Sequence, residues 1–252
     1  MVLDKFRIDG QVAVVTGGTK GIGRAIAQAL AEAGADIAVV SRNPDKGIEK
    51  AVSALGRRYM HYAADLTDRN QTREVVPAVL RMMGAINILV NNSGIIRRAP
   101  AVDYSETDWD ATIEIDLTSA FILCQGCGQI MLKKGKGKII NIASVLALQG
   151  GINVVAYTSA KHGVVGLTKA FANDWAGRGV NVNAIAPSFF ATEMTTALQK
   201  DPERSKSIMA RTPAGRWGDP KDIAGAAVFL ASSASDFIHG VILPVDGGWM
   251  AW

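Results

Sequence analysis

The chain has 252 residues, of which 48% are hydrophobic and 20% charged, and its formal net charge is +4. This length allows one α/β domain with a sizeable core, and the mild, scattered positive charge argues against a nucleic-acid partner. No apolar run approaches the roughly 18–20 residues that cross a bilayer, and the charged N-terminal stretch lacks a signal-peptide core, so we expect a soluble cytoplasmic protein without a membrane partner.

Short β-rich runs alternate with helical patterns along the chain, which is typical of βα units around a parallel sheet. The strands are nearly continuous apolar runs, as expected when both faces of a sheet are covered. We predict strands over 12–17, 36–41, 59–64, 86–92, 137–144, 180–187 and 240–246. We predict helices over 23–34, 44–55, 68–83, 106–113, 117–133, 156–177, 192–199, 202–210 and 220–231.

The predicted fold class is therefore α/β: a single doubly wound Rossmann domain over residues 1–252, with a seven-stranded parallel sheet and helices on both faces. A substrate loop with short helices is expected at about 187–212. The two cysteines, Cys124 and Cys127, lie inside an apolar helical run and cannot complete a four-ligand zinc site by themselves. We interpret them as packing residues and predict no metal site.

A glycine-rich turn, TGGTKGIG at 16–23, joins the first predicted strand to the first predicted helix. Glycine lets backbone N–H groups approach a pyrophosphate, which the helix N-terminus then stabilises. In this strand–turn–helix position the pattern indicates dinucleotide binding. The residues predicted to contact the cofactor here are Gly17, Thr19, Lys20, Gly21, Ile22 and Gly23.

The end of the second predicted strand indicates which dinucleotide binds. A carboxylate there would accept hydrogen bonds from the ribose 2′-hydroxyl and repel a 2′-phosphate. This chain has Ser41, Arg42 and Asn43 instead, with Lys20 in the nearby glycine turn. An arginine offers a planar fork of donors to a phosphate, so we predict NADP(H), with NAD(H) as the alternative. Solvated loop cations would also explain this pattern.

Tyr157 and Lys161, in the stretch VAYTSAKHG, are four residues apart and would share one face of a helix. An ammonium about 4 Å from a phenol, at an effective dielectric near 20, favours the phenolate by at most roughly 4 kcal/mol. The pair therefore predicts a tyrosine whose pKa is lowered towards neutral pH, where it can act as a general acid and base. An isolated pair of this spacing is also compatible with an interfacial tyrosine and a solvated lysine.

These motifs occur together and in order: the glycine turn, Asn91–Gly94, Ser144, and Tyr157 with Lys161. In this the chain resembles the short-chain dehydrogenase/reductase family from end to end. The resemblance implies that Tyr157 exchanges a proton with the substrate oxygen and that Ser144 hydrogen-bonds the same oxygen. It further implies that Lys161 lowers the phenol pKa and binds the nicotinamide ribose, while hydride passes to or from the nicotinamide.

The resemblance also assigns further positions. The family has a fourth catalytic residue, an asparagine, and Asp116 stands in its place here. Its carboxylate is expected to alter the titration of Lys161. Further cofactor contacts implied by the resemblance are Asp65, Leu66, Asn92, Ser93, Gly94, Tyr157, Lys161, Pro187 and Thr192.

Several segments resemble the sugar-acid branch of the family, which includes 2-deoxy-D-gluconate 3-dehydrogenases, 2-dehydro-3-deoxy-D-gluconate 5-dehydrogenases and gluconate 5-dehydrogenases. Such a substrate needs cations for its carboxylate, and Arg97 and Arg98 follow the fourth predicted strand. A local acid such as Asp103, or a subunit contact, would also explain these arginines. The substrate residues implied are Arg97, Arg98, Ser144, Gln149, Asn153 and Met194.

The predicted function is thus an NAD(P)-dependent interconversion of a secondary alcohol and a ketone, on a sugar acid of the deoxygluconate or gluconate type. One alternative is an NADPH-dependent 3-oxoacyl-thioester or broad carbonyl reductase, and another is a non-catalytic dinucleotide-binding regulator. The resemblance implies a homotetramer. The apolar C-terminus, Trp249–Trp252, is expected to pack against the core or a neighbouring subunit.

Overall fold

Seven parallel strands form one sheet in a computed structural model that describes residues 1–251. The strand order is β3-β2-β1-β4-β5-β6-β7, which confirms the predicted doubly wound topology. The strands are β1 (Val12–Thr16), β2 (Asp36–Ser41), β3 (Tyr59–Ala63), β4 (Ile88–Asn91), β5 (Gly137–Ile142), β6 (Val180–Pro187) and β7 (Ile242–Val245). The order reverses between β1 and β4, so the carboxyl ends of these two strands flank the crevice where such sheets bind ligands.

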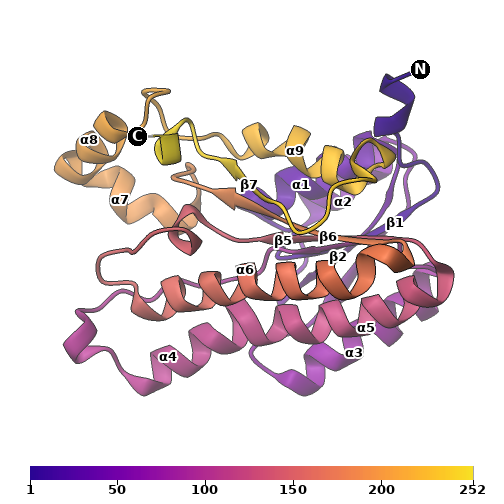
Figure 1. Ribbon diagram of the computed structural model, residues 1–252, viewed down its shortest axis with the longest axis horizontal. Helices are drawn as coiled ribbons and strands as arrows, with labels where there is room; N and C mark the ends of the chain where they lie inside the picture. Colours follow the sequence, from indigo (N-terminus) through magenta and orange to yellow (C-terminus); the bar gives the residue numbers. More distant parts are fainter. Residues whose placement is uncertain (252) are drawn as a thin grey trace.

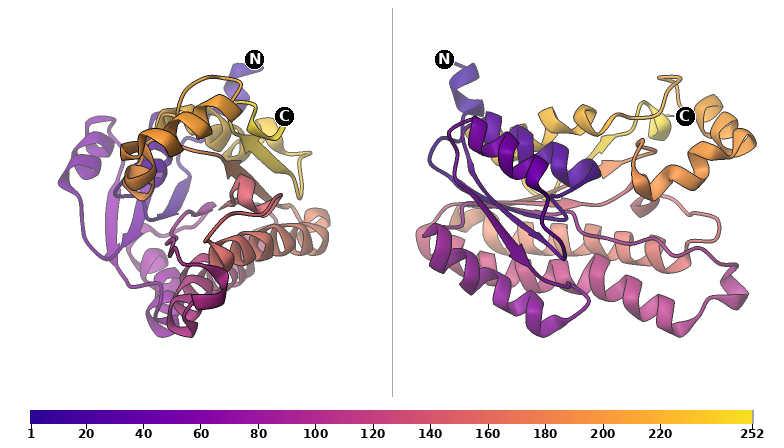
Figure 2. Two further views of the ribbon diagram at one scale, coloured as in Figure 1. Left: turned by 90° about the vertical axis from the view of Figure 1, so that its left-hand side faces the viewer. Right: turned by 180° about the vertical axis from the view of Figure 1, so that it is seen from behind.

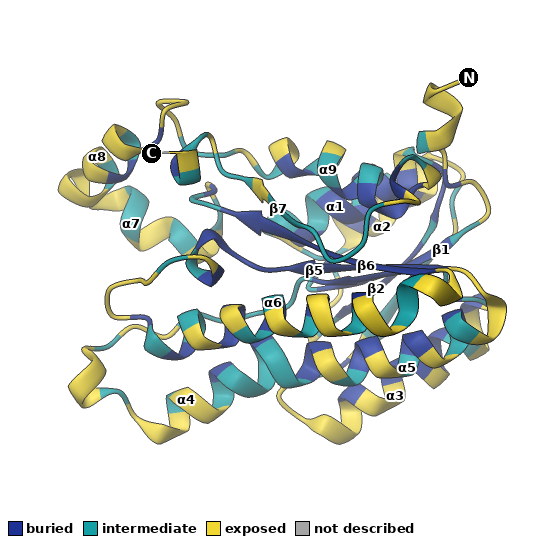
Figure 3. Cartoon of the chain, in the orientation of Figure 1, coloured by how far each residue is buried: buried dark blue, intermediate teal, exposed yellow. Residues whose placement is uncertain are grey.

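Helices cover both faces of the sheet (Figure 1). One face carries α1 (Gly21–Glu32), α2 (Lys46–Ala54) and α9 (Ala224–Ala231); the other carries α3 (Arg69–Met83), α5 (Ser119–Lys134) and α6 (Val155–Trp175). Successive side chains of β1 alternate between the two cores, with Ala13 and Val15 on the first side and Val12 and Val14 on the second. Burial on both sides explains why these strands are continuous apolar runs (Figure 3).

The remaining helices are short or lie at one end of the sheet. They are α4 (Glu106–Ile113), α7 (Thr196–Lys200) and α8 (Pro202–Arg211), with 3₁₀ turns at Leu3–Phe6, Ala101–Asp103, Val145–Ala147, Ala176–Arg178, Glu193–Thr195, Pro220–Ile223, Ser233–Ser235 and Trp249–Ala251. The segment with α7 and α8, drawn in orange, projects at one end of the molecule beyond the sheet (Figure 2). It falls within the predicted substrate loop.

Helix ends follow local capping. The Asp45 carboxylate accepts a hydrogen bond from the Ile48 N–H at 2.8 Å, so α2 begins two residues later than predicted. Strand β5 ends at Ile142 rather than at the predicted residue 144. Ser144 instead caps the following 3₁₀ turn and accepts from the Leu146 N–H at 3.1 Å. This ending leaves the Ser144 side chain beyond the sheet.

The two helices predicted over 106–113 and 117–133 are one continuous helix. A π-helical turn, Glu114–Thr118, joins α4 to α5. Such turns widen a helix locally and occur frequently at functional sites. By length and composition alone this helix, Glu106–Lys134, could cross a membrane, but 44% of its most apolar window is buried inside the fold. A core helix explains both properties.

Cys124 and Cys127 are fully buried in α5 and neither forms a disulfide. Both belong to the core between α3, α5 and the sheet. Burial raises the pKa of the Cys124 thiol to about 12, so it remains protonated at neutral pH. The interpretation of these cysteines as packing residues agrees with this environment.

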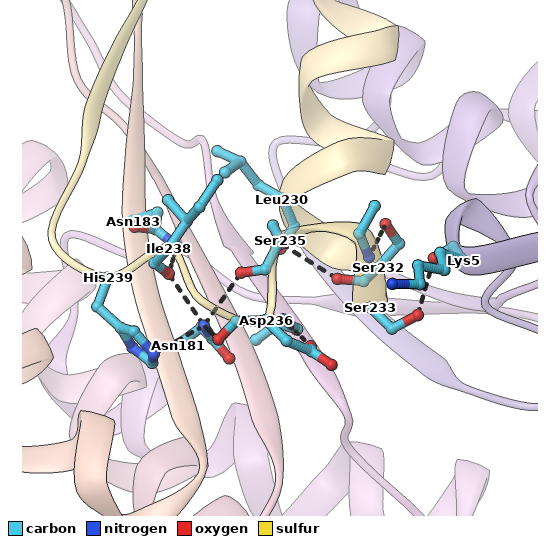
Figure 4. A network of polar contacts seen from close by, with 12 residues as sticks. Lys5, Asn181, Asn183, Leu230, Ser232, Ser233, Ser235, Asp236, Ile238 and His239 are labelled. Atoms are coloured by element: carbon cyan, nitrogen blue, oxygen red, sulfur yellow. Dashed lines mark hydrogen bonds and ion pairs between the residues drawn. The ribbon is translucent and has the colours of Figure 1, made fainter. Parts of the chain in front are cut away.

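Two asparagines of β6 attach the segment that leads into β7 (Figure 4). The Asn181 amide donates to the carbonyls of Asp236 at 3.0 Å and Ile238 at 2.9 Å. Asn183 donates to the Ile238 carbonyl at 2.9 Å and accepts from the Val241 N–H at 3.1 Å. These bonds give side-chain partners to backbone groups of the segment between α9 and β7. They fix where β7 meets β6, and hence where the chain after β7 returns to the cleft.

Candidate active site

A cleft of about 1270 Å³ opens at the carboxyl ends of the strands. It gathers the glycine turn, the ends of β2, β4 and β5, the first turns of α6 and the loop after β6. The predicted residues that line it are Gly17, Thr19, Lys20, Gly21, Ile22, Gly23, Ser41, Arg42, Asn43, Asp65, Leu66, Asn92, Ser93, Gly94, Arg98, Asp116, Ser144, Gln149, Asn153, Tyr157, Lys161, Pro187, Thr192 and Met194. Of the predicted site residues, Arg97 does not line it.

The glycine turn leaves no room for side chains. A Cβ at Gly23 would overlap the Gly17 carbonyl and the Asn92 amide, and Gly17 itself has a φ of +65°. The Asn92 amide holds the turn from the neighbouring strand, donating to the Thr16 carbonyl at 2.9 Å. The backbone at the start of α1 therefore lies open to the cleft, which fits the close approach of a pyrophosphate at a helix N-terminus.

The three residues predicted to select the cofactor lie at the end of β2. The Ser41 hydroxyl donates to the Asn43 carbonyl at 2.8 Å and lies 3.0 Å from Nε2 of His61. Arg42 lines the cleft and forms no ion pair within residues 1–251, although its charge lowers the pKa of the Asp65 carboxyl. Lys20 is differently engaged, because its Nζ pairs with the Glu193 carboxylate at 2.5 Å across the cleft mouth. Of Lys20 and Arg42, it is therefore Arg42 whose side chain is available to bind an added phosphate.

The predicted acid–base group lies at the start of α6. Lys161 Nζ lies 5.5 Å from the centroid of the Tyr157 ring, so the two residues share one face of the helix. The same ammonium donates to the Ile142 carbonyl at 3.0 Å, at the end of β5. Ser144 follows two residues later and its hydroxyl favours the Tyr157 phenolate. The three side chains converge on one part of the cleft.

The pKa of Tyr157 corrects one expectation. Burial raises the pKa of this phenol, and the Asp116 carboxylate raises it further, whereas the charge of Lys161 lowers it. The net direction is upward, so the expected net lowering by Lys161 is wrong for the protein alone. The sign predicted for the lysine is right, but burial outweighs it.

Asp116 lies in the π-helical turn, with its side chain fully buried. One carboxylate oxygen accepts from the Ile95 N–H at 2.7 Å, and the other lies 3.4 Å from Lys161 Nζ. A Cβ at Gly94 would lie 2.7 Å from that second oxygen, so glycine is needed for this close packing. Burial opposes the charge of Lys161, but Asp116 and Tyr157 overcome it and the net pKa of Lys161 is raised. Asp116 thus raises the pKa of Lys161, while burial raises the pKa of Asp116 itself against the opposing charge of Lys161.

Arg97 and Arg98 point to different places. Arg97 lies outside the cleft, with its Nε 3.7 Å from an oxygen of Asp108. The alternative of a local acid therefore describes Arg97, although the acid is Asp108 and not Asp103. Arg98 lines the cleft and its charge favours the Tyr157 phenolate.

The loop after Ser144 carries two further predicted residues. Gln149 accepts a hydrogen bond from Arg211 of α8 at 3.1 Å. Asn153 has a φ of +60°, and its carbonyl accepts from the Ala99 N–H at 3.1 Å. These bonds connect the loop to α8 on one side and to the segment after β4 on the other.

The sequence analysis missed Arg204, Arg211 and Trp249, which also line the cleft. Trp249 is buried and packs with Ile208 and Val145, so this part of the apolar C-terminus packs within its own chain. The last residue of the predicted segment, Trp252, lies outside the described residues. The spacing of 204, 208 and 211 along one helix face was the signal that could have identified α8 as a cleft wall.

A nucleotide-sized cleft, an open glycine turn and a serine, tyrosine and lysine at its inner end define a dinucleotide-dependent oxidoreductase. A family model described as enoyl-(acyl carrier protein) reductase matches residues 17–250. With this match and the relatives below, the chain belongs to the short-chain dehydrogenase/reductase family. It is therefore an NAD(P)-dependent oxidoreductase that acts on a CH–OH group.

The relatives extend over essentially the whole chain. A 2-dehydro-3-deoxy-D-gluconate 5-dehydrogenase from Dickeya dadantii is 47% identical, with 100% of both chains covered. A D-threitol dehydrogenase from Mycolicibacterium smegmatis is 43% identical over 97% of this chain and 94% of its own. The crystal structure of a gluconate 5-dehydrogenase from Burkholderia cenocepacia, in complex with NADP and tartrate, is 40% identical, with a TM-score of 0.92 and 100% of both chains covered.

Proposed function

We propose that the protein interconverts a secondary alcohol and a ketone on a sugar acid of the deoxygluconate or gluconate type, with NADP(H) as the preferred cofactor. The convergence of Ser144, Tyr157 and Lys161 beside the open glycine turn carries this proposal. The names of the similar dehydrogenases support the sugar-acid part. We also propose that the protein is a homotetramer and that it is located in the cytoplasm.

The chain's own residues account for the proton and the orientation of the substrate. Tyr157 gives a proton to the ketone oxygen in reduction and takes it back in alcohol oxidation. Ser144 donates a hydrogen bond to the same oxygen, and Lys161 stabilises the phenolate that forms when the proton leaves. When bound, NADP(H) supplies or accepts the hydride. The glycine turn, Asp65 and Thr192 hold the cofactor along the cleft.

The preference for NADP(H) rests on Arg42 and on the absence of a carboxylate among Ser41, Arg42 and Asn43. We expect Arg42→Ala to raise the KM for NADPH at least tenfold, because a charge-assisted hydrogen bond contributes about 1.5–3 kcal/mol. The KM for NADH should change less than twofold. Lys20→Ala is the matched control: its ammonium is paired with Glu193, so its effect on NADPH should be several times smaller. Equal losses for both variants, or a wild-type preference for NADH, contradict the assignment.

The acid–base role is tested by Tyr157→Phe, which removes the exchangeable proton and keeps the ring. We expect turnover to fall below a few per cent of wild type, while NADPH binding, measured by fluorescence titration, stays within about threefold. The substrates for this assay are 2-keto-3-deoxy acids, gluconates and β-ketoesters. Ketones are assayed with NADPH and with NADH, and alcohols with NADP⁺ and with NAD⁺. Residual activity well above a few per cent of wild type would show that Tyr157 is not the general acid and base.

The same panel, extended by 3-oxoacyl thioesters and simple ketones, separates the alternatives. Turnover of 3-oxoacyl thioesters and simple ketones, but of no sugar acid, identifies a broad carbonyl reductase. Binding of NADPH without turnover of any compound identifies a dinucleotide-binding regulator. Preferred turnover of a sugar acid supports the proposed enzyme.

A further inference from the structure

One face of α8 forms a wall of the cleft. The helix residues that line it are Arg204, Ser207, Ile208 and Arg211. Residues at this spacing lie along a single stripe of a helix, and seven residues span about 10 Å of its axis. The two arginines are therefore directed to the same side, two helical turns apart.

The position of α8 relative to the acid–base group is fixed by packing. Ile208 is buried against Val145, the residue directly after Ser144, and against Trp249. Arg211 stacks on the Trp249 ring at 4.1 Å and donates to Gln149 at 3.1 Å. Arg211 is thereby a positioning residue that anchors the end of the helix at this edge of the cleft.

Arg98 and Arg204, unlike Arg211, have guanidinium groups without a protein partner in the part of the chain that the structure describes. Within residues 1–251, neither guanidinium forms a side-chain hydrogen bond or an ion pair, although both line the cleft. Burial lowers the pKa of Arg98, and the nearby charge of Arg204 lowers it further. Two unpaired cations that repel each other would both be stabilised by an anion placed between them.

The chemistry of such an anion follows from its surroundings. A guanidinium presents paired N–H donors that match a carboxylate. Arg98 lines the same cleft as Tyr157 and its charge lowers the pKa of the phenol, so an anion held by Arg98 lies in the part of the cleft that holds the acid–base group. A carboxylate on the substrate itself meets both conditions.

We propose that Arg98 and Arg204 form the subsite that binds the carboxylate of the sugar-acid substrate, with Arg211 holding α8 in place. This inference rests on the proposed function and adds Arg204 of α8 to Arg98, which the resemblance had already implied, as a residue that distinguishes an acid from a neutral polyol. Arg204 lies far from the catalytic motifs in the chain, and only the folding of α8 over the cleft brings it to them.

The experiment measures binding separately from turnover. D-Gluconate and its neutral analogue D-glucitol are titrated calorimetrically into NADPH-loaded protein, where no oxidation can occur. Arg204→Gln should raise the Kd for gluconate at least tenfold and leave that for glucitol within twofold. Lys206→Gln removes one charge from an exposed side chain of the same helix that does not line the cleft, and it should change neither.

A second variant tests whether the two arginines share one ligand. Arg98→Gln should also weaken gluconate binding, and the double variant should lose less than the product of the two single losses, because both contacts serve the same carboxylate. In turnover assays with a sugar acid, Arg204→Gln should raise KM at least tenfold with kcat within about threefold.

The results that would contradict the subsite differ from those that would contradict the proposed function. Unchanged gluconate binding in Arg204→Gln, equal weakening of gluconate and glucitol, or no gluconate binding by the wild type overturns the subsite. A raised KM for acetoacetyl-coenzyme A alone shows that the cations bind phosphate groups and also overturns it. If the wild type binds gluconate through Arg204 but oxidises no sugar acid, the subsite stands and the proposed function fails.

Discussion

Asp116 shows how one residue can change the titration of a whole site. Its carboxylate lies 3.4 Å from Lys161 Nζ in a buried position and raises the pKa of both Lys161 and Tyr157. It also fixes the backbone after β4 through the Ile95 N–H. An asparagine could keep that hydrogen bond and remove the charge, so the two effects are separable.

We predict that Asp116→Asn moves the pH dependence of alcohol oxidation to lower pH. Oxidation needs the deprotonated phenol, so kcat/KM rises as pH passes through the pKa of Tyr157. The Asp116 charge raises that pKa, and its removal lowers it, so the rise occurs at lower pH. The measurement is a kcat/KM profile in the oxidative direction.

The control for this profile is Asp108→Asn, which removes a carboxylate that is 46% exposed and pairs with Arg97 outside the cleft. Its profile should coincide with that of the wild type. If the rise of kcat/KM in Asp116→Asn occurs at the same pH as in the wild type, or at a higher pH, Asp116 does not raise the pKa of Tyr157.

At the scale of the elements, strand β6 depends on two buried asparagines to hold the segment before β7. Asn181 donates to three backbone carbonyls, those of Ser235, Asp236 and Ile238. Asn181 is 5% exposed and Ser235 is buried, whereas Asp236 is exposed and Ile238 is partly exposed. Truncation removes the side-chain donor to the Asp236 carbonyl, while the Ile238 carbonyl keeps the Asn183 amide and the Ser235 carbonyl keeps the Ile238 N–H.

We expect Asn181→Ala to lower the free energy of unfolding by about 1–3 kcal/mol, because it removes the hydrogen bonds of a buried side chain. Urea unfolding followed by circular dichroism measures this change. Asn70→Ala, at an exposed position in the first turn of α3, should alter the free energy of unfolding by less than about 0.5 kcal/mol. A loss at Asn181 no larger than at Asn70 would show that the network adds no stability.

Local sequence patterns located most elements to within two residues, because caps and turns are local. Ser144 and Asp45 end or begin elements through hydrogen bonds to backbone groups two or three residues away. The sequence predicted a break at 114–116 between two helices, whereas a π-helical turn at Glu114–Thr118 continues the helix through this segment. Its effect is to bury Asp116 beside Lys161, which periodicity cannot reveal.

At the scale of the whole molecule, one face of α5 and α6 remains uncovered. Phe121 of α5 is 39% exposed and stacks with Phe171 of α6, ring centroids 6.2 Å apart. Both helices cover the same side of the sheet and show partly exposed outer surfaces (Figure 3). Exposed aromatic rings on adjacent long helices favour contact with a second copy of the chain.

We predict that light scattering coupled to size-exclusion chromatography gives four times the chain mass of 26.6 kDa. Phe121→Asp introduces charge into the uncovered face and should shift the protein to smaller species, because a buried unpaired charge disfavours the interface. Lys50→Asp, at an exposed position of α2 on the opposite face of the sheet, is the control and should leave the mass unchanged. A monomeric wild type contradicts the homotetramer.

The sequence by itself determined the order of strands and helices along the chain and the glycine turn, because each is a local pattern with a local physical cause, and its resemblance to the family supplied the proposed acid–base residues. The tertiary structure alone decided which cations face the cleft. Arg97 turns to Asp108, Lys20 pairs with Glu193, and Arg204 reaches the site although it lies far along the chain. Side-chain direction and partners depend on contacts between distant segments, and these exist only in the folded chain.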